Sequence, residues 1–532
     1  MLYTSHLIFT IILSLFTGIS NEKTPEKPNI LFILVDDLGC DDMGFSGSKY
    51  YETPHTDSLA KKGTIFTRGY SASSVCSPSR ASILTGTWPT VHGITDYLYA
   101  KTGEAWSKTG RHTKLLPPPY QLSIDANLTT IAQVLHHNGY KTVMAGKWHL
   151  GKESENASPT DKGFDVNIGG SESGGPYSGG YFSPFNNEKL IDRPQEQGMS
   201  YAMKLVKELG LFIEQNKNTP FFAYLSFYEV HAPIQTSESK WKKYRDKSDQ
   251  QGIHDVGFDT SHFFPTRKYQ DNPVYAGLIE QMDDAVGVIL QKLKELKLDK
   301  NTIVVFTGDN GGVNSGDDYS TAPLHYRGGK GMQWEGGTRV PLVVYVPWLK
   351  QVPTSDTPVS GIDFFPTLLH LTLNDRYHIR QKLNGTNISP LLKGQAIKDR
   401  ALYWHYPHYS NQGSQPASYV VKDNWKLIYY YEDKHEELYN LDTDPFENNN
   451  VAQTNTKERV RLRKILFNWL NETCASSPVP DKNYIPEALA QWKQEINTKQ
   501  LKKLEAHRKE ILKIKWKPNE NWWKSKVISN DN

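Results

Sequence analysis

The segment ILFILVDDLG, residues 30–39, decides the predicted fold of this chain. Six apolar residues stand in a row at positions 30–35, a pattern typical of a strand that is buried on both faces of a sheet. Asp36 and Asp37 follow where that strand would leave the sheet. Because open α/β sheets bind ligands at the carboxyl ends of their strands, the segment predicts a central strand with a polar site at its end.

Further apolar runs rich in β-branched residues predict more buried strands. They lie at residues 142–145, 221–227, 303–307 and 342–346. Helical patterns fall between them, at residues 128–138, 275–296 and 364–371. This alternation predicts an α/β fold with a large, mostly parallel sheet and helices on both faces.

The pattern changes near residue 395, after which short strands and tight turns are expected. The expected strands are residues 419–422, 425–431 and 437–441, and a helix is expected at 457–470. We therefore expect an N-terminal α/β domain and a C-terminal subdomain with a small antiparallel sheet and a packed helix, followed by a basic extension. Their boundaries are 21–395, 396–475 and 476–532.

The basic extension contains a lysine-rich helical pattern at residues 500–517, and two tryptophans, Trp522 and Trp523, near its end. This pattern is typical of a solvated surface helix. An anchor on an acidic polysaccharide or a cell surface is the alternative.

Composition limits the kind of protein this is. The chain has 532 residues, 37% of them hydrophobic, which is enough for a large core. Lysine and arginine number 61 against 58 acidic residues, so the overall charge gives no broad surface for nucleic acid. The three cysteines, Cys40, Cys76 and Cys474, are too few for a disulfide framework, and whether Cys40 and Cys474 pair stays open.

The first twenty residues resemble a signal peptide. A short apolar run at residues 7–16 precedes the small residues Gly18 and Ser20, so we expect residues 1–20 to be removed and the protein to be secreted or periplasmic. Only His6 precedes the run in place of a positive n-region, so an uncleaved anchor is the alternative. No later stretch is long enough for a transmembrane helix in the mature chain.

A second acidic cluster repeats the arrangement of the first. The segment FTGDNGG, residues 306–312, follows another apolar run and supplies Asp309 and Asn310 before two glycines. Together with Asp36 and Asp37 these residues provide four hard oxygen donors, which suit calcium or magnesium and not a soft metal.

The segment VCSPSRASILTG, residues 75–86, predicts a helix that begins at Cys76. Pro78 is suited to an early helical position and Gly86 to the helix end. The free amides and the dipole of a helix N-terminus favour an anion, so Cys76 is a candidate nucleophile beside an anionic group. Taken alone, the cysteine would fit a plain buried residue better.

The motif CSPSR, residues 76–80, matches in full the Cys-x-Pro-x-Arg signature of the formylglycine-dependent sulfatases, and the chain resembles this family over residues 28–450. Secreted bacterial polysaccharide sulfatases are the most similar in appearance. The resemblance implies an alkaline phosphatase-like fold. It also implies that a formylglycine-generating or anaerobic sulfatase-maturing enzyme converts Cys76 to 3-oxoalanine, or formylglycine. The implied Ca²⁺ ligands are Asp36, Asp37, Asp309, Asn310 and the modified Cys76, with Mg²⁺ as an alternative ion.

Further motifs extend the resemblance. AGKWHLG, residues 145–151, is similar to a second family signature, and an extended strand exit would place Lys147 and His149 on one face. His231 lies in His-Ala-Pro and Lys330 in a glycine-rich loop. Taken alone, each would fit an ordinary surface lysine or structural histidine.

By this resemblance, catalysis proceeds through the hydrated aldehyde of residue 76, which attacks sulfur. Arg80 would support the hydrate, and Lys147 and Lys330 would clamp the sulfuryl group. His231 would protonate the departing alcohol. His149 would then remove a proton so that sulfate leaves and the aldehyde returns.

The predicted function is therefore hydrolysis of sulfate esters on a carbohydrate, such as ulvan, carrageenan or glycosaminoglycan or their oligosaccharides. The loops at residues 406–409 and 410–415, including His408, are expected to line the sugar pocket, and the glycine-rich loop at 169–180 its rim. Two alternatives remain: a phosphate mono- or diester hydrolase of the same superfamily, and an inactive sugar-binding relative.

Overall fold

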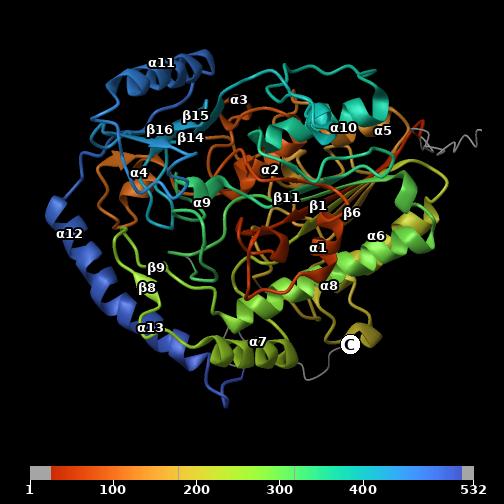
Figure 1. Cartoon of the computed structure of the whole chain (residues 1–532), viewed down its shortest axis with the longest axis horizontal. Coiled ribbons are helices and arrows are strands. Elements are labelled where there is room, and N and C mark those ends of the chain that lie inside the picture. The colour runs from red at the N-terminus through yellow and green to blue at the C-terminus, as the bar shows by residue number, and fades with distance from the viewer. Residues whose placement is uncertain (1–24, 178, 317, 518–532) are drawn as a thin grey trace, which may run out of the picture.

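The computed structural model describes residues 25–517 apart from 178 and 317, and its centre is an eight-stranded sheet. The strands are β1 (Asn29–Val35), β2 (Thr64–Phe66), β5 (Lys141–Gly146), β6 (Val166–Ile168), β7 (Phe221–Phe227), β10 (Thr302–Gly308), β11 (Leu342–Tyr345) and β12 (Thr354–Ser355). Their order across the sheet is β12-β2-β11-β10-β1-β7-β5-β6, so β1 lies in the interior (Figure 1). All five strands expected from the apolar runs are present.

The sheet is mostly parallel, as expected. β10, β1, β7, β5 and β6 run parallel to one another. β11 is the exception among the expected strands, because it runs antiparallel to β10 and to β2. The parallel pairing of β1 with β10 brings Val35 opposite Gly308, so both strands end at the same edge.

Helices cover both faces of the sheet, which confirms the predicted layers (Figure 1). Alternate residues of β1 enter the two cores: Leu31 and Ile33 belong to one, Phe32 and Leu34 to the other. The first core is closed by α1 (Pro54–Ala60), α6 (Tyr201–Gln215), α7 (Glu238–Gln251) and α8 (Pro273–Glu295). The second core is closed by α2 (Cys76–Thr85), α5 (Ile131–His137) and α10 (Phe364–Leu373).

A four-stranded antiparallel sheet with one packed helix follows, as expected. It contains β14 (Leu402–Tyr406), β15 (Ala417–Lys422), β16 (Trp425–Tyr430) and β17 (Glu436–Asn440), covered by α11 (Thr456–Glu472). A buried ion pair joins this sheet to α9 (Glu335–Thr338), since Lys426 Nζ lies 3.0 Å from Glu335 Oε1. The smaller elements are α3 (Pro89–His92), α4 (Gly103–Ser107), β3 (Gly69–Tyr70), β8 (Phe258–Asp259), β9 (Thr266–Arg267) and β13 (Val359–Ser360).

The basic extension packs against the rest of the chain, and its last helix lies at the surface, as expected, with one buried side chain, Arg508. β18 (Val479–Pro480) pairs with β4 (Leu115–Leu116), and α12 (Pro486–Glu495) leads through a π-helical turn into α13 (Leu501–Glu510). Arg508 on α13 is fully buried, and its Nη2 lies 2.6 Å from Asp271 Oδ2. Helix α13 also ends earlier than the pattern over 500–517 predicts.

Several expectations concern the ends of the chain. The predicted signal peptide, residues 1–20, and the pair Trp522 and Trp523 lie outside the described residues. Within residues 25–517, no helix combines the length and apolar character needed to cross a bilayer. Cys40 and Cys474 are free thiols in this structure, and Cys474 is exposed.

Candidate active site

Two acidic segments meet at the carboxyl edge of the large sheet, directly after β1 and β10. Asp37 has a left-handed backbone conformation with φ of 58°, so the chain bends after Asp36 and the two adjacent carboxylates need not point in opposite directions. The backbone amide of Asp37 donates to Asp309 Oδ1 at 3.1 Å. Asn310 Nδ2 donates to Asp37 Oδ1 at 2.8 Å. The strand pairing therefore brings together all four oxygen donors that the sequence predicts.

These residues fit a divalent cation. One carboxylate oxygen from each of Asp36, Asp37 and Asp309 lies within 4.8 Å of the others, and all three side chains are buried. Buried like charges at such separations repel unless a cation compensates them. Two oxygens in the cluster, Asp36 Oδ1 and Asn310 Oδ1, are buried without a hydrogen-bond partner, which a metal ligand would explain.

Arg80 ties helix α2 to this cluster. Its Nε donates to Asp309 Oδ2 at 2.7 Å and its Nη2 lies 3.4 Å from Asp36 Oδ1. Its Nη1 donates to the Ser226 hydroxyl at 2.6 Å. Burial opposes the charge of the guanidinium, but Asp309 and Asp36 outweigh burial and raise the pKa of Arg80. Arg80 is therefore a permanent, fixed cation beneath the site.

Two lysines complete the charge balance. Lys147 Nζ lies 2.6 Å from Asp36 Oδ2, and Lys330 Nζ lies 2.7 Å from Asp37 Oδ2. Burial favours the neutral amines, but the carboxylates outweigh burial and raise the pKa of both lysines. Conversely, although burial opposes its charge, Lys330 holds the pKa of Asp37 below its usual range. Both lysines are thus charged and positioned before any ligand arrives.

Cys76 is the first residue of α2, as predicted, and Gly86 ends that helix in the left-handed conformation. The Cys76 side chain is only 2% exposed, and its Sγ lies 3.4 Å from His149 Nδ1. Burial raises the pKa of the Cys76 thiol. Since the thiolate is the reactive form, the unmodified thiol is a poor nucleophile here.

Two neutral histidines flank Cys76. Burial, followed by the field of Lys147, lowers the pKa of His149 well below its usual value. Burial and Lys330 lower the pKa of His231 to about 3. His149 has φ of 55°, so the expected extended strand exit is wrong, although Lys147 and His149 both reach the site. A left-handed residue turns the chain more sharply than the two-residue repeat of a strand allows.

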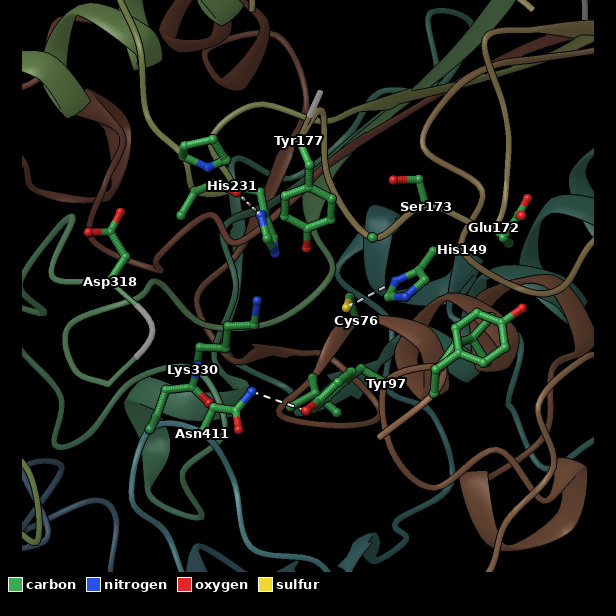
Figure 2. Close-up of a pocket in the computed structure, with 17 residues that line it drawn as sticks. Cys76, Tyr97, His149, Glu172, Ser173, Tyr177, His231, Asp318, Lys330 and Asn411 are labelled. Carbon is green, nitrogen blue, oxygen red and sulfur yellow. Dashed lines mark hydrogen bonds between the residues drawn. The ribbon is translucent and has the colours of Figure 1, made fainter. Parts of the chain in front are cut away.

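A cavity of about 520 Å³ opens above these groups. Cys76, His149, His231 and Lys330 line it, and Figure 2 shows them around its centre. The acidic cluster, Arg80 and Lys147 do not line the cavity but lie beneath it. An anionic group entering the cavity would meet the Lys330 ammonium, both histidines and residue 76 together.

Two models of known protein families match this chain. A family model described as Sulfatase matches residues 28–374 of the chain. This protein belongs to the sulfatase family. A model described as N-sulphoglucosamine sulphohydrolase, C-terminal, matches residues 327–473 of the same sulfatase. The protein is therefore a sulfuric ester hydrolase, and the predicted enzyme class is confirmed.

Relatives of this sulfatase include a protein named Sulfatase from Formosa agariphila. It is 27% identical, over 90% of this chain and 96% of its own length. The solved structure of Ps i-CgsB in complex with k-i-k-neocarrahexaose is 25% identical, with a TM-score of 0.67 over 90% of this chain and 99% of its own. The phosphonate monoester hydrolase of Agrobacterium radiobacter matches with a TM-score of 0.61 over 86% of this chain and all of its own, at 17% identity, which shows the alkaline phosphatase-like fold alone.

The structure corrects one prediction about the pocket of this sulfatase. His408 does not line the cavity, because it is fully buried and its Nε2 lies 2.9 Å from Thr95 Oγ1. The following loop does reach the cavity, through Asn411 and Gln412. Burial lowers the pKa of His408 to about 3, which makes it a neutral core histidine.

Most residues of the cavity wall of the sulfatase were not predicted from the sequence. The glycine-rich loop at residues 169–180 does form part of the wall, as expected. The loop was predicted only as a whole, and neither its individual side chains nor the other wall residues were named. The missed residues are Val75, Tyr97, Leu98, Tyr99, Glu172, Ser173, Tyr177, Pro233 and Asp318.

Proposed function

We propose that this sulfatase removes sulfate ester groups from a carbohydrate, a sulfated polysaccharide or its oligosaccharides. The proposed nucleophile is formylglycine made from Cys76 by a formylglycine-generating or anaerobic sulfatase-maturing enzyme. One observation carries the proposal: Cys76 opens into the cavity while Arg80, one helical turn further along α2, contacts Asp36 and Asp309. The helix thus holds residue 76 over a buried acidic cluster that fits a divalent cation.

The proposed cofactor set is one Ca²⁺ ion with the formylglycine at position 76. Asp36, Asp37, Asp309 and Asn310 would hold the ion, because their oxygens are buried together and two of them have no hydrogen-bond partner. The ion would neutralise charge on the sulfate oxygens, and the hydrated aldehyde would supply a hydroxyl that attacks sulfur.

The remaining residues position charge and protons. Lys330, which lines the cavity, and Lys147, which lies beneath it, hold two fixed positive charges for the anionic sulfuryl group. His231 lines the cavity beside Lys330 and is neutral there without a ligand. The negative charge of a bound sulfate ester would raise the pKa of His231, and the protonated ring would then donate a proton to the departing alcohol oxygen. His149 Nδ1 lies 3.4 Å from Sγ of residue 76, close enough to remove a proton from the hydrated form and release sulfate.

The carbohydrate assignment has two supports. The cavity wall carries Tyr97, Tyr99 and Tyr177, and aromatic faces with nearby amides suit sugar rings. Ps i-CgsB, which matches over most of this chain, is solved with a neocarrahexaose. Carrageenan, ulvan and glycosaminoglycan oligosaccharides are therefore the substrates to screen, with the enzyme acting in the periplasm or outside the cell.

The phosphate-ester alternative is weaker. Enzymes of that kind typically use a serine or threonine nucleophile and a second metal site, whereas this chain has Cys76 and, among the described residues, a single buried cluster of three carboxylates. The inactive alternative conflicts with the complete set of charged side chains around Cys76.

Two measurements test the proposal. The protein is co-produced with a maturing enzyme, and the mass of the peptide containing Cys76 is measured to detect oxidation of the cysteine CH2–SH group to an aldehyde with loss of sulfur. The matured protein, loaded with Ca²⁺, is then assayed for sulfate release from the three polysaccharide classes. An unmodified thiol in an active preparation, or no sulfate release from any sulfate ester by the modified form, would overturn the proposal.

A further inference from the structure

The residues of the cavity wall would contact the part of the substrate that surrounds its sulfate group. We define the rim as six wall residues around the catalytic side chains: Tyr97, Tyr99, Glu172, Tyr177, Asp318 and Asn411. Tyr99 and Tyr177 are each 48% exposed, so their rings are available to a ligand. Asn411 Nδ2 donates to the Tyr97 hydroxyl at 3.1 Å, which fixes one polar part of the rim. These groups suit a ring with apolar faces and hydroxyl groups.

The charges of the rim are negative. Glu172 and Asp318 are its two ionisable acids, and Figure 2 shows them on opposite sides of Cys76. Asp318 is held in place by hydrogen bonds from the Tyr319 amide at 2.8 Å and the Ser320 hydroxyl at 2.7 Å. The cavity wall therefore carries two acidic side chains, and burial raises the pKa of one of them, Asp318, above its ordinary value.

Positive charge is confined to the centre. Of the described residues that line the cavity, Lys330 is the only lysine or arginine, and its ammonium is bonded to Asp37. Arg111 is half-buried and does not line this cavity; its Nη2 donates to Asn411 Oδ1 at 2.7 Å and its guanidinium lies 4.9 Å from the Trp106 ring centre. The rim therefore presents no guanidinium to pair with a carboxylate or a second sulfate.

We propose that the pocket selects a neutral sugar unit carrying one sulfate, and discriminates against units with a carboxylate or a second sulfate at the rim. This inference rests on the proposed function, because it assumes that a sulfate ester occupies the centre. A further anion a few ångströms from Glu172 or Asp318 is repelled, and at the intermediate dielectric of a pocket mouth each such contact weakens binding by roughly three- to tenfold. Within the proposed polysaccharides, this favours galactan-type chains over uronate-containing chains.

A matched pair of ligands tests the inference. One is a monosulfated tetrasaccharide that contains uronate, and the other is the same molecule after its carboxylates have been reduced to hydroxymethyl groups. Their dissociation constants are measured by calorimetry on the Ca²⁺-loaded C76A protein, which cannot cleave them. We expect the reduced ligand to bind about three- to tenfold tighter at low ionic strength, with the ratio approaching one as salt is added.

Variants assign the effect to the rim. E172Q and D318N should each tighten binding of the carboxylated ligand while changing the reduced ligand much less. E472Q, at the exposed C-terminal end of α11, is the matched control and should leave the ratio unchanged. Equal affinities, tighter binding of the carboxylated ligand, or binding of neither would overturn the inference. Sulfate release by the matured wild-type enzyme is a separate readout, so failure of the proposed function is recognised independently.

Discussion

Arg80 Nε lies 2.7 Å from Asp309 Oδ2, although 229 residues separate the two along the chain. This contact fixes the start of helix α2 against the end of β10, so the position of Cys76 depends on the same carboxylate that fits a metal ligand. A change in the acidic cluster would therefore also shift the position of Cys76.

Replacing the proposed nucleophile should separate its two chemical steps. Cys76→Ser offers a hydroxyl that can accept a sulfuryl group but has no second hydroxyl through which to expel it. We expect steady-state turnover to fall by at least about a thousandfold. Intact mass should show a protein carrying one added sulfuryl group. Cys474→Ser, which changes an exposed thiol elsewhere, should retain full activity. Normal turnover by Cys76→Ser would rule out the mechanism.

Metal removal should reduce both activity and stability. Asp36, Asp37 and Asp309 are buried close together, and a bound ion would add contacts to two oxygens, Asp36 Oδ1 and Asn310 Oδ1, that lack a hydrogen-bond partner. We expect a chelator to abolish sulfate release and to lower the melting temperature, and Ca²⁺ to restore both. An ion present at a hundred times its dissociation constant stabilises the fold by about 2.7 kcal/mol. Full activity after exhaustive chelation would contradict the metal assignment.

The proposed role of His231 predicts a dependence on the leaving group. A phenol leaves readily without protonation, whereas a sugar hydroxyl does not. His231→Ala should therefore lower kcat on a sugar sulfate by roughly 10²- to 10⁴-fold and on a nitrophenyl sulfate far less. His149→Ala, by contrast, should affect both substrates alike, because it acts after the alcohol has left. Equal losses in His231→Ala on the two substrates would exclude the proton-donor role.

His408 and Asn411 should give opposite results, although they lie in neighbouring loop positions. His408 is fully buried, so His408→Ala creates a cavity and leaves Thr95 without its partner, and we expect a loss of roughly 2–4 kcal/mol in unfolding free energy. Asn411 lines the pocket, so Asn411→Ala should instead raise KM with little change in stability. Denaturant unfolding and steady-state kinetics on both variants separate these outcomes. Unchanged stability in His408→Ala would contradict the core assignment.

Asp96 should make stability depend on pH. Burial raises its pKa from an ordinary value of 3.8 to about 7. The folded state then holds the proton of Asp96 more tightly than the unfolded state. The contribution of protonated Asp96 to the free energy of unfolding is therefore fully present below pH 3.8 and is lost as the pH rises toward 7. Asp96→Asn keeps an acceptor for the Tyr406 hydroxyl but cannot ionise. Its stability relative to wild type should therefore increase between pH 4 and 7, and a pH-independent difference would contradict the raised pKa.

Much of the large sheet could be predicted because its central strands are long and apolar on both faces. The run at residues 30–35 is apolar at every position, as in a strand buried on both faces, and the strand that it predicts is β1. The outer strands β2 and β12 have only three and two residues and carry no periodic signal. The antiparallel direction of β11 likewise depends on which partner it meets, and an apolar run does not encode direction.

Some residues of the candidate site could likewise be predicted from the sequence and others could not. Asp36, Cys76 and Asp309 follow or begin regular elements, where a motif can be tied to a sheet edge or a helix end. Tyr97, Glu172 and the other rim residues stand singly in loops, and no spacing relates them before the chain folds. His408 was misplaced because its loop was assigned to the pocket as a whole, whereas only Asn411 and Gln412 reach it.

The burial of Cys76 has a consequence for the order of events in biosynthesis. With 2% of its surface exposed at the bottom of the cavity, this side chain is out of reach for the active site of another protein once the fold has closed. On the proposed chemistry, the aldehyde must be installed while residues around position 76 are still an open polypeptide. A molecule that folds before modification would keep an unreactive thiol at position 76. The yield of active enzyme would therefore depend on the rate of Cys76 oxidation relative to the rate of folding.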